Sequence, residues 1–273
     1  MLEPFSLPFF QQGLLQVVLL AVGAGLIGTQ IVLRGLAFFA HTVGTATFPG
    51  LVLAEGLGIA AALGAGLSGL LVVGGVGLLA RGEGERHDAP TALVLVAALG
   101  VGVLLASEVF TASGSVEGLL FGSLLLVDGA DVALAAGASG VAVVLAVLLE
   151  PRWLVTGFDR ASARALGVRS APGDVALLGV IALLAVSALA TLGALLVTAL
   201  LVVPAATTRL VCSRLRSWQL ATVALGVAEG AGGLWLAFQL NAPPGAAIAV
   251  LGGAVFTATA LALGLRRPVR AAA

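Results

Sequence analysis

Long apolar segments alternate with short polar segments along the whole chain. Each apolar segment is hydrophobic on every face for about 20 residues, which is the length of a membrane-spanning helix. The strands of a membrane barrel would instead alternate between apolar and polar positions. We therefore predict transmembrane helices over residues 13–33, 36–55, 58–80, 91–110, 132–149 and 218–240, and a last one that ends at residue 265.

A further apolar run lies between Asp174 and Arg209, where no residue is charged. Arginines flank this run at Arg169 and Arg209, and both are expected on the same side of the membrane. One crossing would separate the two arginines, so the run should fold as a hairpin of two short helices. We place its turn near residues 191–193, and we expect Pro204 to loosen the end of the second helix.

Together these segments predict an all-α, polytopic integral membrane protein with about eight or nine transmembrane helices. Short, broken helices are expected near the second predicted helix, at residues 36–55, and near the seventh, which ends close to Arg209. No repeat and no change of composition divides the chain, so we expect residues 1–273 to form one transmembrane domain.

The composition agrees with this class and limits the partners. Hydrophobic residues make up 60% of the chain, charged residues 10%, and the mean hydropathy is +1.18. A soluble protein of this size needs more polar surface, so the expected surroundings are a lipid bilayer. The net charge is zero and no basic patch is present, so nucleic acid is not an expected partner. The single cysteine, Cys212, excludes an intrachain disulfide and a thiolate metal cluster.

The distribution of arginines predicts the orientation in the membrane. The chain has thirteen arginines and no lysine, and the arginines lie in clusters between the apolar segments. Positive residues favour the cytoplasmic side, and one arrangement places all thirteen there. It puts the N-terminus outside and the C-terminus in the cytoplasm of the plasma or inner membrane. Residues 150–173 then form the longest cytoplasmic loop.

Two segments carry ionisable groups that are costly at membrane depth. In residues 36–55, His41 and Thr45 are four residues apart and share one helix face, ahead of a Pro49-Gly50 break. Glu229 lies midway along the helix at 218–240. Such groups usually mark a transport pathway. The alternatives are a neutral imidazole bonded to a carbonyl for His41 and a protonated acid bonded to a neighbouring helix for Glu229.

Sequence motifs exclude several kinds of chemistry. G-x-G-x-x-G occurs at residues 23–28 and 64–69, but both copies lie inside apolar helices, where they indicate small-residue packing faces. No phosphate-binding G-x-x-x-x-G-K-[ST] motif is present, so the chain is not expected to hydrolyse ATP itself. H-E-x-x-H and G-x-S-x-G are also absent. We expect a protein that is not itself an enzyme and has no covalently bound cofactor.

Part of the long loop is expected to form a short capped helix. Asp159 is a good N-cap and Gly167 a good residue after the C-terminus. Arg160 and Arg164 share one face of this helix, and Phe158 and Leu166 offer apolar contacts. The helix could lie at the interface with anionic lipid or dock a cytoplasmic partner, and the residues alone favour neither.

Several segments, in order, resemble the permease subunits of ABC importers for zinc, manganese and ferrous iron. The strongest resemblance is in LGALLVTALLVVPAATTRL, residues 192–210. The others are residues 32–54, 118–125, 158–168 and 241–253. The resemblance covers nearly the whole length of the chain.

This resemblance implies a homodimeric permease domain whose cargo is a divalent metal ion. Two ABC ATPase subunits would bind through residues 158–168, and an extracytoplasmic metal-binding protein would deliver the ion. It also implies a path beside residues 36–55, where His41 stands at the family's aspartate and Thr45 at its histidine. The usual carboxylate–imidazole pair is therefore absent. In a symmetric dimer, two His41 side chains could meet near the axis.

Two other functions are consistent with the same residues. An ion-coupled secondary transporter would use Glu229 as a proton or cation site and would work without an ATPase. A structural membrane subunit would tolerate leucine at both His41 and Glu229. Dependence on a separate ATPase distinguishes the permease from both.

Overall fold

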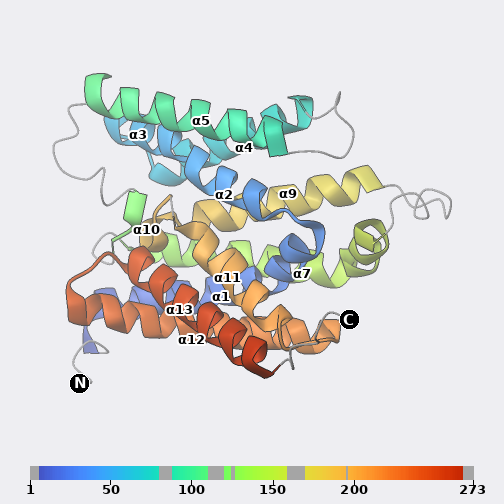
Figure 1. Cartoon of the computed structure of the whole chain (residues 1–273). Helices are drawn as coiled ribbons and strands as arrows, with labels where there is room; N and C mark the ends of the chain where they lie inside the picture. The colour runs from blue at the N-terminus through green and yellow to red at the C-terminus, as the bar shows by residue number, and fades with distance from the viewer. Residues whose placement is uncertain are drawn as a thin grey trace.

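The computed structural model describes residues 6–79, 88–109, 120–123, 127–158, 170–194 and 196–266. In these ranges the secondary structure is helical and contains no strand, which confirms the all-α prediction. The helices lie roughly side by side in a bundle (Figure 1). They are α1 (Pro8–Arg34), α2 (Ala37–Ala46), α3 (Phe48–Leu57), α4 (Ala61–Leu79), α5 (Asp88–Leu104), η3 (Leu105–Val109), α7 (Gly129–Phe158), α9 (Ser170–Ser187), α10 (Leu189–Leu192), α11 (Val197–Arg209), α12 (Leu215–Leu240) and α13 (Pro244–Arg266).

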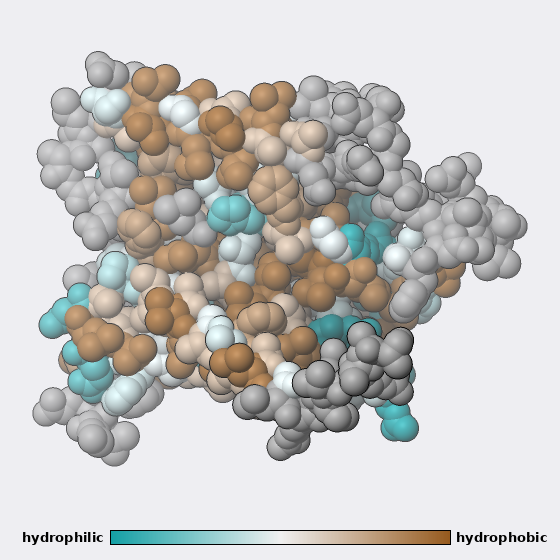
Figure 2. Space-filling view, in the orientation of Figure 1, coloured by the Kyte–Doolittle hydropathy of each residue, from teal (hydrophilic) through white to brown (hydrophobic). Residues whose placement is uncertain are grey.

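Helix lengths agree with a chain that crosses a membrane several times. Among the described residues, five helical segments are long and apolar enough to span: α1, α2 with α3, α7, α12 and α13. Shorter apolar helices lie within α4, α5, α9 and α11. The surface of the bundle is hydrophobic over much of the face that Figure 2 shows. On α4, the exposed Leu63, Leu67, Leu70 and Leu71 form a stripe at helical spacing, as a lipid-facing surface requires.

The predicted second helix is broken, but two residues earlier than the Pro-Gly pair. α2 ends at Ala46, Thr47 separates the two helices, and Pro49 lies in the first turn of α3. Proline is tolerated in a first turn because the backbone N–H that it lacks would have no partner there. The helix is therefore interrupted before Pro49, which lies in the first turn of the second half.

The predicted hairpin is confirmed, with its turn where the sequence placed it. α9 and the single turn of α10 lead to Gly193, whose φ of 73° is left-handed, and α11 returns along the bundle. Pro204 lies inside α11, which continues to Arg209, so the expected loosening is not seen as an interruption of the helix. The hydroxyl of Thr208 donates to the carbonyl of Pro204 at 2.8 Å in this last turn.

α1 lies at the centre of the packing, in contact with α7, α11 and α12. Its glycines allow these close approaches: Gly23 faces Ser139 of α7, and Gly28 faces the backbone of Leu201 of α11. The other G-x-G-x-x-G segment behaves in the same way, because Gly64 of α4 packs against the backbone of Gly50. Both motifs are thus helix-packing faces, as the sequence predicted.

Three segments from distant parts of the chain meet at one end of the bundle, where α10 lies beside the start of α13 (Figure 1). Gly122 has a φ of 80° and approaches the carbonyl of Thr191. Gly193 approaches the carbonyl of Leu120, and Gly245 approaches that of Leu192. We call Gly122, Gly193 and Gly245 the glycine junction. It brings together the described residues of three of the five segments that carry the family resemblance, around Gly122, Gly193 and Gly245.

Replacing Gly245 with alanine should destabilise the protein, because its Cβ would collide with the carbonyl oxygen of Leu192. Overpacking of this kind costs about 1–3 kcal/mol. Gly253→Ala, on the same helix, is the matched control, since no atom lies within 4 Å of a Cβ built there. Thermal unfolding in detergent should show a lower midpoint for Gly245→Ala than for the wild type. The midpoint of Gly253→Ala should not be lowered. Equal midpoints for the two variants would contradict the close packing at the junction.

Candidate translocation site

His41 lies on α2 at the contact between α2 and α11. Its Nδ1 atom is 3.4 Å from the hydroxyl oxygen of Thr198, near the start of α11. Gly44, one turn further along α2, makes this approach possible, because a Cβ there would lie 3.2 Å from the carbonyl oxygen of Ala194. His41 itself is half-buried. Figure 2 shows a small hydrophilic area among hydrophobic side chains over the region of α2 and α11.

Threonine hydroxyls add to the polarity of α2. Thr42 and Thr45 are fully buried, and neither hydroxyl oxygen has a hydrogen-bond partner among the residues that the structure describes. Thr45 lies one turn from His41 on the same face, as the sequence predicted from their spacing. An unpaired buried hydroxyl is costly, and both side chains are 0% exposed, so a ligand would reach these oxygens only if α2 moved relative to its neighbours. One imidazole and neutral hydroxyls are thus grouped on α2 and the start of α11.

Glu229 is on α12 and is only 4% exposed. Its carboxylate lies between α11 and α13, beside Gly252 and Val203, and Oε1 has no hydrogen-bond partner among the described residues. Thr198 and Val203 are five residues apart on α11, which places them about 140° apart around that helix. Glu229 and His41 therefore meet α11 on different faces, and the structure does not group them into one site.

The described residues contain no group of three His, Cys, Asp or Glu side chains that could hold a metal ion. Among these residues, the polar partner of the His41 ring is the hydroxyl of Thr198. A site of higher coordination would need water or a second copy of the chain.

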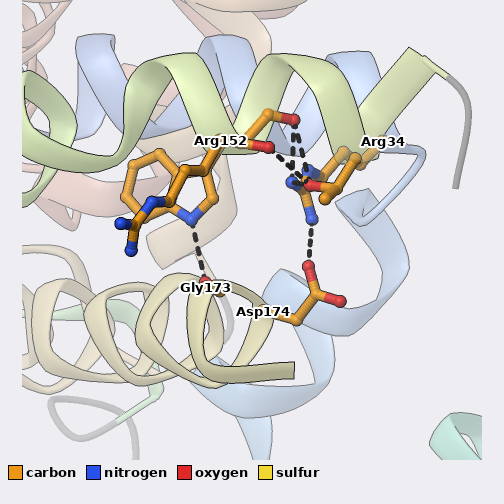
Figure 3. Close-up of polar contacts among 6 residues, drawn as sticks. Arg34, Arg152, Gly173 and Asp174 are labelled. Atoms are coloured by element: carbon orange, nitrogen blue, oxygen red, sulfur yellow. Dashed lines mark hydrogen bonds and ion pairs between the residues drawn. The ribbon is translucent and has the colours of Figure 1, made fainter. Parts of the chain in front are cut away.

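A buried arginine connects three helices at the other end of the bundle from the glycine junction (Figure 3). Arg34, the last residue of α1, pairs with Asp174 of α9 at 2.5 Å. Its other terminal nitrogen donates to the Trp153 carbonyl at 2.8 Å and the Thr156 hydroxyl at 2.6 Å, both on α7. The indole N–H of Trp153 donates to the carbonyl of Gly173 at 2.8 Å. We call these five residues the arginine cluster.

The predicted docking helix falls mostly outside the described residues. Asp159, Arg160, Arg164, Leu166 and Gly167 are in this gap, and Phe158 is the last residue of α7. The capped helix therefore stays a prediction. The structure does describe both flanks of the loop, which are the end of α7 and the start of α9, and the arginine cluster joins these two flanks.

Sequence reasoning missed Thr198 and the arginine cluster. Thr198 is a lone hydroxyl in the apolar run from Leu192 to Val203, and that isolation was the available signal. Arg34 and Asp174 are 140 residues apart, and each borders an apolar segment, where a charge has an ordinary explanation. The sequence gives no sign that these two charges pair.

Comparison with protein families decides the class of this chain. The sequence model of the ABC 3 transport family matches residues 6–262. The chain belongs to the ABC 3 transport family. Members of this family are transport permease subunits, so this family membership favours the permease over an ion-coupled carrier.

Relatives in the ABC 3 transport family are similar over nearly their whole length. The manganese import system permease protein ScaB of Streptococcus parasanguinis is 32% identical over 249 residues, covering 91% of this chain and 88% of that protein. A probable iron transport system membrane protein of Haemophilus influenzae is 28% identical, covering 94% of both. The solved structure of PsaBC from Streptococcus pneumoniae in complex with Fab has a TM-score of 0.82 and 25% identity, and the match covers 93% of this chain and 91% of that one.

Proposed function

We propose that this chain is the membrane permease subunit of an ABC importer for a divalent metal cation, with His41 in the translocation path. The observation that supports this most directly is the placement of His41. It lies on a broken intramembrane helix, at the position where the resembling permeases have their aspartate, and it faces Thr198 of α11. Helix breaks and ionisable groups at membrane depth are typical of transport pathways.

The chemistry at His41 favours a metal that accepts nitrogen. With Nδ1 directed at Thr198, Nε2 is the ring nitrogen that would bind the passing ion. Imidazole suits zinc, copper, nickel and iron, whereas manganese prefers oxygen ligands. The relatives named for manganese and iron support a divalent metal as the substrate class, and histidine in place of the aspartate shifts the expected preference within that class. Two copies of the chain in a dimer would supply two imidazoles.

The principal test measures metal uptake by the permease reconstituted with its ATPase subunits. His41→Ala should abolish saturable uptake. His41→Asp should keep saturable uptake but shift the metal preference toward manganese, because a carboxylate replaces the imidazole. Uptake should persist when the proton gradient is collapsed and should stop without the ATPase. Normal uptake by His41→Ala would remove His41 from the path. Uptake without an ATPase that is lost in Glu229→Gln would establish the ion-coupled carrier instead.

Thr198 should act through His41 by orienting its ring. Thr198→Val keeps the shape of the side chain and removes its hydroxyl, so the half-saturating metal concentration should rise about tenfold or more. Thr257→Val is the matched control, because that exposed hydroxyl on α13 bonds only within its own helix, to Gly253 at 2.8 Å. An equal effect of both substitutions would show a general response to loss of a threonine hydroxyl.

We further propose that two ATPase subunits dock at residues 158–168, that an extracytoplasmic binding protein delivers the metal, and that the assembly contains two copies of this chain. The support is family membership and the capped, arginine-bearing pattern of the loop. Reversing the charge of Arg160 and Arg164 together should separate ATP hydrolysis from metal uptake without lowering the unfolding temperature. If this double variant transports like the wild type, the loop is not the docking element.

The proposed orientation has the N-terminus outside and the C-terminus in the cytoplasm of the cell membrane, because all thirteen arginines then lie inside. In a Cys212→Ser background, Asp128→Cys and Pro244→Cys should react with an impermeant thiol reagent added outside intact cells. Gly84→Cys and Arg160→Cys should react only after the cells are opened. External labelling of Gly84→Cys would contradict the proposed orientation.

A further inference from the structure

We propose that Arg34 is a positioning residue that connects the flanks of the 159–169 loop to the helix that carries His41. The inference rests on the proposed function, in which this loop contacts the ATPase and His41 lines the path. One buried guanidinium, with its partners on α7 and α9, then transmits motion from the loop to the helix that carries His41.

The contacts of Arg34 join three helices through a single side chain. Its guanidinium bonds Asp174 on α9 through one terminal nitrogen and Trp153 and Thr156 on α7 through the other. The side chain of Arg34 is 6% exposed and that of Asp174 is 24% exposed. A planar, forked donor can hold two acceptor groups at a fixed separation, which the single ammonium of lysine cannot do. Figure 3 shows Arg34 between α7 and Asp174.

The same contacts hold both flanks of the loop. Thr156 is two residues before the end of α7, and Asp174 is in the first turns of α9. Trp153, 1% exposed, joins these flanks a second time through Gly173. A displacement of the loop by a bound ATPase therefore moves α7 and α9 together. Because Arg34 bonds both helices, it moves with them.

The turn after Arg34 leads directly into α2. Gly35 has a φ of 67°, Leu36 follows with its N–H bonded to the Ile31 carbonyl at 2.9 Å, and α2 begins at Ala37. His41 is seven residues after Arg34. With only this tight turn between them, a displacement of Arg34 reaches α2 without passing through a flexible linker. The cluster thus connects the loop with the contact between His41 and Thr198.

A purely structural role would have a different signature from a coupling role. A structural cluster affects folding, so its loss would reduce metal uptake and ATP hydrolysis together. A coupling cluster affects the ratio of the two, because hydrolysis continues while its motion is transmitted poorly to α2. The decisive quantity is the number of metal ions taken up per ATP hydrolysed.

The test uses the permease reconstituted with its ATPase subunits and binding protein in liposomes. Arg34→Lys keeps the charge but loses the fork, and Asp174→Asn keeps an acceptor but loses the ion pair. Each should lower metal uptake per ATP by about fivefold or more while ATP hydrolysis stays close to wild type, both measured well below the unfolding temperature of each variant. Arg152→Lys, an exposed arginine-to-lysine change on α7, is the matched control and should keep the wild-type ratio.

The same measurements distinguish three outcomes. A wild-type ratio in Arg34→Lys and Asp174→Asn overturns the inference and leaves the proposed function intact. Uptake and hydrolysis that fall in parallel, with a lower unfolding temperature, show that the cluster only stabilises the fold, which also overturns it. Absence of ATP-dependent metal uptake by the wild-type assembly contradicts the proposed function itself.

Discussion

An interrupted helix inside the membrane must have its freed backbone groups bonded by neighbouring protein, and the arrangement around α2 and α3 depends on this requirement. At the break, the Thr47 hydroxyl donates to the Gly44 carbonyl, and Ser68 of α4 donates to the Ala46 carbonyl, both at 2.5 Å. The close packing of Gly50 against Gly64 holds α4 near enough to make this contact. α3 and α4 therefore supply the packing and the hydrogen bond at the break, while α2 lies in contact with α11.

The fold was largely predictable because crossing a membrane leaves strong patterns in a sequence. The length of each apolar run, the arginines between runs and the missing charges before Arg209 led to the helices and to the turn at Gly193. The position of the break was predicted less well. Pro49-Gly50 is the visible signal, but a proline fits the first turn of the new helix, so the actual interruption lies at Thr47.

The sequence pointed to candidate polar residues, but it did not show their partners or which of them lie together. His41, Thr45 and Glu229 stand out because polar groups are rare in apolar helices. Their neighbours could not be found from one sequence, since helices that are apolar on all faces give no sign of which side meets which helix. Thr198 beside His41, and α11 between His41 and Glu229, became visible only in three dimensions.

The central position of α1 has a consequence for how the protein is made. Gln16 of α1 is fully buried and bonds the carbonyl of Ser187, 171 residues later, and the hydroxyl of Thr191. α1 is synthesised first, so its amide enters the lipid long before either partner exists. Until the ribosome has passed residue 191, this helix needs water, another protein or a temporary partner for Gln16. Insertion and assembly are thus separate events for the first helix, and its final packing waits for the last third of the chain.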